Sequence, residues 1–245
     1  MEATEKIKQL DAIATQSDPS QGLDGLLMVY IFNTIVEHLR GREILEMGCR
    51  GGRMTGLLAS VCEHLDVVDG SRVYLERAKE NVWANNVDYH WSLFEEFNSN
   101  RHYTDIVMVG GLDHVDGPVA FLRRYADMLA PGGAMHIIEL NALSMHRRLG
   151  VKMNILKSHG ELTDRDRWLG HLRVYGPSTL RRDIEAAGFV VTYFTGIFLK
   201  PLATGQLTGL GQPVLDALFE LGKDIPEWCN YIYYRAEKLM YDPGH

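Results

Sequence analysis

The stretch EILEMGCRGGR, residues 43 to 53, decides the fold, because it passes from apolar residues into glycines. Such a pattern is typical of a buried strand that turns sharply into a helix at a nucleotide-binding loop. The spacing is not the Gly-x-Gly-x-x-Gly of dinucleotide-binding loops, since Arg50 stands between Gly48 and Gly52. Glu46, just before the turn, would repel a pyrophosphate but suits a ligand that carries an ammonium group. The stretch therefore predicts a cofactor loop for a ligand without phosphates.

Strands and helices alternate on both sides of this loop. Helical periodicity or capping marks the segments 52–64, 71–85, 118–133 and 177–189. Strand-like segments occupy 43–48, 65–70, 87–91, 103–111, 134–140, 190–198 and 229–237. This order predicts an α/β fold with a doubly wound, seven-stranded, mostly parallel sheet. The last two strands, with a helix between them, are expected to form an antiparallel pair at one edge.

The chain of 245 residues is expected to form a single domain, because no repeat or Pro/Ser-rich linker divides it. Apolar residues at helical spacing near the start predict an N-terminal helical cap. The expected parts are the cap (1–40), a cofactor-binding core (41–141), a basic substrate-cap segment (142–180), and a C-terminal helix with edge strands (181–245).

Composition and charge narrow the functional classes. The net charge of −7 argues against nonspecific binding to nucleic acid, which needs phosphate neutralisation. Residues 121–182 nevertheless hold 11 Lys and Arg against 5 Asp and Glu, which indicates either solvated helix charges or a local anion-attracting surface. The first residues lack the apolar core of a signal peptide, and no apolar run is long enough to span a bilayer. The three cysteines are not spaced as the ligands of a metal site. We expect a cytoplasmic enzyme without a membrane partner.

Five short motifs follow one another: LEMGCRGG, VVDGS, SLFEEF, GGLDHV and LAPGG. In this order the chain resembles the class I S-adenosylmethionine-dependent methyltransferases, most clearly over residues 40 to 140. The resemblance implies a Rossmann-like methyltransferase fold and S-adenosylmethionine as the cofactor. This ligand carries an ammonium and a sulfonium group but no phosphate, in agreement with Glu46.

The resemblance also implies roles for individual residues. It places Glu46, Gly48, Cys49 and Gly52 at the methionine part of the cofactor and Gly110 near the sulfonium. Asp69 is implied to bind the ribose, with Gly70 and Ser71 beside it. Ser92, Leu93 and Phe94 are implied to flank the adenine. Plain core packing would account equally well for Leu93 and Phe94. Arg50 replaces the middle glycine of the family loop, so its side chain is expected to point away from the methionine part; otherwise it would fill the site.

The methyl acceptor is expected to be a small polar and anionic molecule of the sugar or natural-product type. A hydroxyl or amine acceptor needs a base to take its proton, and His114, His146 and His171 are the candidates. The residues expected to bind the substrate are Asp113, Arg147, Arg148, Arg173 and Tyr175, since arginine forks match carboxylate and phosphate oxygens. No metal is expected, although Asp113, Glu139 and Asn141 could converge on one.

A different class of function stays open at this point. A methyltransferase-like chain that no longer binds its cofactor tightly could serve as a nucleotide-sensing or partner-binding module. The absence of a stability shift with S-adenosylmethionine would favour that alternative.

Overall fold

A computed structural model describes residues 3–16 and 22–239 of the chain. The expected helical cap and the C-terminal part therefore lie partly outside the described residues. The strands are β1 (Glu43–Met47), β2 (His64–Asp69), β3 (Val87–Trp91), β4 (Tyr103–Val109), β5 (Leu129–Leu140), β6 (Phe189–Ile197) and β7 (Tyr231–Lys238).

Helices separate most of these strands. The α-helices are α1 (Ala3–Gln16), α2 (Gly22–Ile35), α3 (Arg53–Ala59), α4 (Arg72–Asn81), α5 (Pro118–Ala126), α6 (Met145–Lys152), α7 (Asp164–Leu169), α8 (Pro177–Ala186), α9 (Thr204–Leu207) and α10 (Gln212–Asp224). Short 3₁₀ helices are η1 (Val36–His38), η2 (Leu112–His114) and η3 (Pro226–Trp228). No helix in the described part of the chain is long and apolar enough to cross a membrane.

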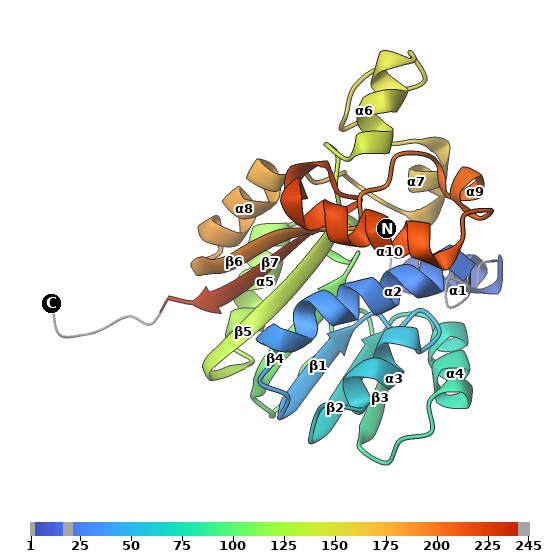
Figure 1. The fold of residues 1–245 in the computed structure, drawn as a ribbon. Coiled ribbons are helices and arrows are strands. Elements are labelled where there is room, and N and C mark those ends of the chain that lie inside the picture. The colour runs from blue at the N-terminus through green and yellow to red at the C-terminus, as the bar shows by residue number, and fades with distance from the viewer. Residues whose placement is uncertain (1–2, 17–21, 240–245) are drawn as a thin grey trace, which may run out of the picture.

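The seven described strands form one sheet in the order β3-β2-β1-β4-β5-β7-β6 (Figure 1). β1 to β5 pair in parallel, whereas β7 is antiparallel to both of its neighbours. This confirms the predicted doubly wound, mostly parallel sheet. The last two strands pair antiparallel at one edge of the sheet, as predicted, with β6 outermost and β7 between β5 and β6.

Two apolar cores cover the two faces of the sheet. Along β4, Val107 packs into one core while Ile106 and Met108 pack into the other, as the two-residue period of a strand requires. One core contains side chains of α2, α3, α4 and α10, and the other contains those of α5 and α8. The helices thus hold the carboxyl ends of β1, β2 and β4 at a common edge, where ligands bind in open α/β sheets.

One local prediction needs correction. The Ala-Pro-Gly-Gly stretch expected to end a helix lies inside β5, where the register shifts opposite Tyr103 and Asp105. A Cβ on Gly133 would stand 2.8 Å from the carbonyl oxygen of Tyr103, so glycine permits this close strand approach. Residues 142–172, in which no strand was predicted, contain the helices α6 and α7.

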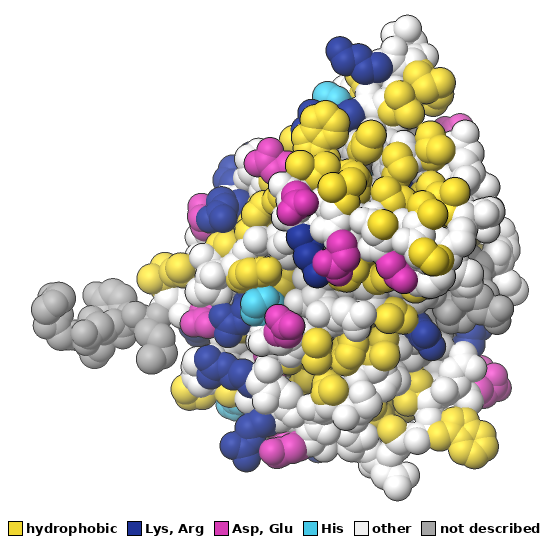
Figure 2. Space-filling model, viewed as in Figure 1, with side chains coloured by type: hydrophobic (Ala, Val, Ile, Leu, Met, Phe, Trp, Pro, Cys, Tyr) yellow, Lys and Arg dark blue, Asp and Glu magenta, His cyan; other side chains and the backbone are white. Residues whose placement is uncertain are grey.

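The helices after β6 form a layer over one end of the sheet. α10 packs against α2, where the rings of Tyr30 and Phe219 stack with centroids 4.4 Å apart. Hydrophobic side chains gather on the surface over α9 and α10 in Figure 2. Leu210, Val214 and Leu221 are among those exposed. This layer therefore presents apolar as well as charged surface.

Candidate active site

The loop after β1 is shaped by glycines with left-handed backbone. Gly48 and Gly52 have φ of 87° and 90°, a region that favours glycine. The N–H of Gly48 donates to the carbonyl of Val68 at 2.8 Å, which ties the loop to β2. A Cβ on Gly52 would lie 2.9 Å from the Cα of Ala78, so the loop approaches α4 more closely than a side chain would allow. The two glycines set the path of the loop.

Asp69 at the end of β2 joins this loop to the next one. Its buried carboxylate accepts the N–H of Cys49 at 3.0 Å and the N–H of Ser71 at 2.8 Å. Burial raises the pKa of Asp69, and the hydrogen bonds from Ser71 and Cys49 oppose that rise. Because a carboxylate oxygen can accept more than one hydrogen bond, the group can still accept ribose hydroxyls, as predicted for Asp69.

Glu46 lies buried inside β1. Its Oε2 accepts the hydroxyl of Thr55 at 2.6 Å, whereas Oε1 has no hydrogen-bond partner among the described residues. Burial raises the pKa of Glu46 to about 8. An unpaired, buried carboxyl oxygen is costly, so it marks a position where a donor from a ligand would be stabilising.

Substitution of Glu46 by Gln should flatten the pH dependence of stability in the cofactor-free protein. The folded protein keeps Glu46 protonated to about pH 8, while an unfolded glutamate ionises near pH 4.3, about its reference value. The stabilising contribution is therefore full below the unfolded pKa and is lost as the pH rises toward 8. Urea unfolding at pH 5 and pH 8 measures it, with the exposed Glu63→Gln as control. An unchanged difference between the two pH values would contradict the assignment.

The segment after β3, predicted to flank the adenine, packs against the two loops. Leu93 is buried, and its Cδ2 lies 3.0 Å from the position of a Cβ on Gly70. The Cζ of Phe94 lies 3.4 Å from the corresponding position on Gly48. The hydroxyl of Ser92 donates to the carbonyl of Leu93. Phe94 thus packs against the β1 loop and Leu93 against the loop after β2, and their roles at the adenine stay predictions.

Helix α1, part of the predicted N-terminal helical cap, packs against the loops beside this segment. The hydroxyl of Ser71 donates to Asp11 at 2.7 Å, and Lys6 forms an ion pair with Glu95 at 2.6 Å. The Cδ1 of Leu10 lies 2.7 Å from the position of a Cβ on Gly70. α1 therefore lies across the loops that follow β2 and β3. Only its amphipathic pattern was visible in the sequence.

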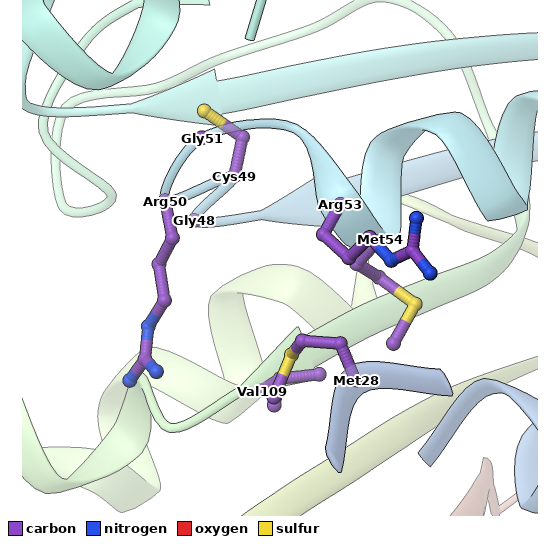
Figure 3. Close-up of a pocket in the computed structure, with 8 residues that line it drawn as sticks. All are labelled: Met28, Gly48, Cys49, Arg50, Gly51, Arg53, Met54 and Val109. Carbon is purple, nitrogen blue, oxygen red and sulfur yellow. The ribbon is translucent and has the colours of Figure 1, made fainter. Parts of the chain in front are cut away.

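A pocket opens between the β1 loop, α2, α3 and β4. It is lined by Met28, Gly48, Cys49, Arg50, Gly51, Arg53, Met54 and Val109 (Figure 3). Arg50 has a φ of 52°, and its side chain runs from the loop toward Gly110. Its Nη2 lies 3.1 Å from the position that a Cβ on Gly110 would take. The expectation that Arg50 points outward is therefore wrong. Its backbone takes a left-handed conformation that directs the side chain across the pocket.

Beyond Gly110, two histidines and two carboxylates come together. The Nδ1 of His171 lies 3.5 Å from Asp113 and 3.4 Å from Asp166. The rings of His171 and His114 meet edge to face, with centroids 4.7 Å apart, and the Nε2 of His114 lies 3.6 Å from Asp113. The cluster combines two predicted base candidates with Asp113. Sequence reasoning missed Asp166, whose local pattern indicates only a helix capping box with Thr163.

Electrostatic surroundings distinguish the members of this cluster. Burial lowers the pKa of His114, and the neighbouring Asp113 opposes that shift. The pKa of Asp166 lies well below its ordinary value: burial raises it, but hydrogen bonds from His171 and Thr163 outweigh that effect. Asp166 is therefore an ionised carboxylate at neutral pH. It can hold the Nδ1–H of His171 and leave Nε2 free to accept a proton.

Glu139 at the end of β5 borders the cluster. Its Oε1 accepts the N–H groups of Gly111 at 3.1 Å and Leu112 at 2.8 Å, whereas Oε2 has no partner among the described residues. Burial and the carboxylate of Asp113 raise the pKa of Glu139 well above its ordinary value. Glu139 thus supports the backbone that carries Asp113.

The third base candidate, His146, has a different environment. It lies at the start of α6, and its N–H donates to the carbonyl of Lys200 at 3.1 Å. Burial and the charge of Lys200 lower the pKa of its ring to about 4. Its Nδ1 has no partner among the residues that the structure describes, and no carboxylate lies within ion-pair distance of its ring there. The geometry therefore favours His171 over His146 as a base.

The arginines assigned to an anionic acceptor bind the chain itself. Arg147 is buried, donates to the carbonyls of His159 and Glu161, and lies 3.7 Å from Asp166. Its guanidinium group does not face an open cleft, so the predicted contact with an acceptor is not met. It instead holds the segment between α6 and α7 in place.

Arg148 and Tyr175 also have partners within the fold. Arg148 donates to the carbonyl of Leu143 at 2.6 Å and lies over the ring of Trp228. Tyr175 is buried, and its hydroxyl donates to Asp183 at 3.2 Å. These contacts explain the positions of both side chains without a bound methyl acceptor.

Arg173 donates to the carbonyls of Leu112 and Val115, and to that of Asp116 at 3.2 Å. It therefore fixes η2, which carries Asp113 and His114, rather than presenting a free guanidinium fork.

A cation site is geometrically conceivable at the same cluster. One ligand atom from each of Asp113, His114 and His171 lies within 4.8 Å of the others, and such nitrogen and oxygen donors suit a divalent transition metal. Asn141, predicted as one of three possible ligands with Asp113 and Glu139, uses its amide group within the fold. Its amide donates to the carbonyls of Glu227 and Cys229, and its oxygen accepts from Leu143.

Comparisons with known proteins identify the family and the fold. A family model described as a methyltransferase domain matches residues 27–193. A ubiquinone biosynthesis O-methyltransferase of Sinorhizobium fredii is 27% identical over 175 residues, which span 67% of this chain and 66% of that protein. One from Aromatoleum aromaticum is 25% identical over 208 residues, spanning 82% of this chain and 80% of that protein. The N-methyltransferase NodS from Bradyrhizobium japonicum, solved with S-adenosyl-L-homocysteine, shares the fold with a TM-score of 0.64 at 14% identity, covering 98% of this chain and 100% of that one.

Proposed function

Because this chain belongs to the methyltransferase-domain family, we propose that it transfers the methyl group of S-adenosylmethionine to a hydroxyl oxygen of a small molecule. The cofactor supplies a methyl carbon already activated by its sulfonium. The protein must then orient the acceptor in line with that carbon and take its proton. An amine acceptor is the nearest alternative within the same chemistry.

The observation that carries the proposal is the position of His171. Its Nδ1 faces the carboxylates of Asp113 and Asp166, so the ring is oriented as in a carboxylate–histidine pair. The N–H of Leu172 donates to the carbonyl of Asp113 at 2.9 Å, which fixes the histidine beside η2. A neutral Nε2 is then the atom that accepts the hydroxyl proton. Asp113 and Asp166 stabilise the imidazolium that forms.

The cofactor loop fits the proposed ligand. Glu46 has an unpartnered buried oxygen for the ammonium group, and the carboxylate of Asp69 can accept ribose hydroxyls. The curated O-methyltransferase relatives favour oxygen over nitrogen as the acceptor atom. We do not extend the proposal to an anionic acceptor, because Arg147 and Arg173 donate to backbone carbonyls.

A matched pair of acceptors tests the proposal. The purified protein would be incubated with S-adenosylmethionine and a set of catechols, phenols and sugars, each beside an analogue in which an amine replaces the hydroxyl. Mass spectrometry would detect the methylated product, and formation of S-adenosylhomocysteine would give the rate. Methylation of hydroxyl acceptors, with little on their amine analogues, is the expected result.

Two other outcomes would change the assignment. Transfer to the amines alone would make the chain an N-methyltransferase. Tight S-adenosylmethionine binding without any transfer would favour a binding module. A stability shift measured with S-adenosylmethionine alone separates that outcome from loss of cofactor binding.

A further inference from the structure

We propose that His64, Asp66 and Asp88 bind a divalent transition-metal ion of the zinc type on the face shared by β2 and β3. The three residues lie in the outermost strand pair of the sheet, where β3 is the edge strand. None of them belongs to the cofactor loop or to the cluster around His171. The proposal therefore stands or falls separately from the methyl transfer proposed above.

The first argument is the register of the two strands. β2 and β3 pair in parallel, with Asp66 opposite Asp88. Side chains two residues apart on a strand point to the same face, so His64 lies on the same face as Asp66. Each of the three side chains offers one ligand atom, and these atoms lie within 4.8 Å of one another. The strand pairing thus gathers one imidazole nitrogen and two carboxylate oxygens, donors that suit zinc.

The second argument is the spacing of these atoms. The Nε2 of His64 lies 3.4 Å from the Oδ1 of Asp66 and 3.6 Å from the Oδ2 of Asp88. Both distances are longer than the roughly 2.7–3.2 Å of most N–H···O hydrogen bonds. Ligand atoms about 2.0–2.2 Å from a tetrahedral zinc ion stand about 3.3–3.6 Å from one another. The separations therefore match the edges of a metal site better than direct hydrogen bonds.

The third argument is the way in which Asp66 is held. Its carboxylate is buried, and the hydroxyl of Tyr103 donates to its Oδ2 at 2.8 Å. The Nε2 of His90 lies 2.7 Å from its Oδ1, which is hydrogen-bond distance. Outer contacts of this kind orient the carboxylates that bind metals in proteins. Asp88 is exposed, so an ion can reach the oriented carboxylate from the solvent.

The fourth argument is the charge of the surroundings. Arg101 lies 3.6 Å from Asp66, 3.7 Å from Asp88 and 3.5 Å from Glu43. Three carboxylates thus share one guanidinium, which leaves two negative charges for a divalent cation to balance. The side chain of Arg101 is 49% exposed, so the guanidinium can move into the solvent when an ion enters. Such an ion would tie the edge strand β3 to β2.

Zinc titration of the purified protein, by competition with a chromogenic chelator, tests the site. Asp113, His114 and His171 form a second group with metal-binding geometry, so the variants must tell the two places apart. His64→Ala and Asp88→Ala should each lower the zinc affinity by about tenfold or more, whereas His171→Ala should leave it within about twofold. Zinc should also raise the midpoint of thermal unfolding of the wild-type protein but not that of His64→Ala, because an ion bound to the folded state stabilises it.

Arg101→Ala gives a result of the opposite sign. It removes a competing cation, so it should raise the zinc affinity by about threefold or more. His102→Ala is the matched control, since His102 is an exposed histidine next to Arg101 and is not one of the ligands. Thermal melts without zinc show whether each variant folds.

Three outcomes would overturn the proposal. The first is a zinc affinity in folded His64→Ala equal to that of the wild-type protein. The second is a loss in His171→Ala instead, which would place the zinc ion at the other cluster. The third is a lower affinity in Arg101→Ala, because the guanidinium would then hold the carboxylates in place rather than compete with the ion.

Discussion

Replacement of His171 by Ala should lower kcat by about 100-fold or more, with KM for the acceptor much less affected. The reason is the proton of the acceptor: a hydroxyl is a poor nucleophile until a base takes its proton, and the Nε2 of His171 is the base that we propose. His102→Ala is the matched control, because His102 is exposed beside the start of β4, at the opposite end of that strand from η2.

Further variants separate a base from a metal ligand at this cluster. Asp166→Asn should lower kcat less than His171→Ala, since Asp166 orients the ring and does not take the proton itself. Treatment of the wild-type protein with a chelator should leave kcat unchanged. A loss of activity that added zinc or magnesium restores would instead assign Asp113, His114 and His171 to a cation. Full turnover in His171→Ala would show that the acceptor needs no base from this residue.

Replacement of Asp69 by Ala should weaken S-adenosylhomocysteine binding by about 1.5–3 kcal/mol, the range of hydrogen bonds to a charged group. This corresponds to roughly ten- to a hundredfold in the dissociation constant. Both S-adenosylhomocysteine and 5′-methylthioadenosine contain the ribose, so both should lose affinity. Asp127→Ala, which removes an exposed carboxylate paired with Lys238, is the control.

Asp69 also holds the N–H groups of Cys49 and Ser71, so its removal could disturb the loops. Asp69→Asn keeps the volume and one acceptor oxygen, and a thermal melt of each variant without ligand reports on folding. Unchanged affinity for both ligands in a folded Asp69→Ala variant would refute the role of this carboxylate at the ribose.

The core of the fold could be predicted because its signals are local. β3 occupies Val87–Trp91, the same residues as the predicted strand, and the β1–loop–α3 transition follows from apolar residues beside glycines. The position of β7 could not be predicted, because which strands pair with Tyr231–Lys238 depends on contacts far apart in sequence. The helix predicted between the last two strands is α10, but its start could not be predicted, since Gly211 and Pro213 resemble the residues of a turn although they begin the helix here.

At the site, the residues that form the cofactor loop were easier to predict than the directions of their side chains. Asp69 and Gly48 follow from motif spacing along the chain. The side-chain directions of Arg50, Arg147 and Arg173 depend on backbone conformation and on carbonyl groups supplied by distant segments, such as that of Leu112 for Arg173. A count of basic residues therefore predicted an anion-binding surface where the folded chain uses the same charges to hold its own loops.

The place of β7 in the sheet also has a consequence for the order in which a newly made chain can fold. β1 to β4, together with the residues from Glu46 to Gly110, leave the ribosome well before Tyr231 is added, and they can pair as soon as they emerge. β6 is made earlier than β7, yet within the described sheet β7 is its neighbour and links it to β5. Until Tyr231–Lys238 has been synthesised, β5 and β6 each expose an unpaired edge. The cofactor edge can thus assemble during translation, whereas the other half of the sheet closes when the later strand inserts between two earlier ones.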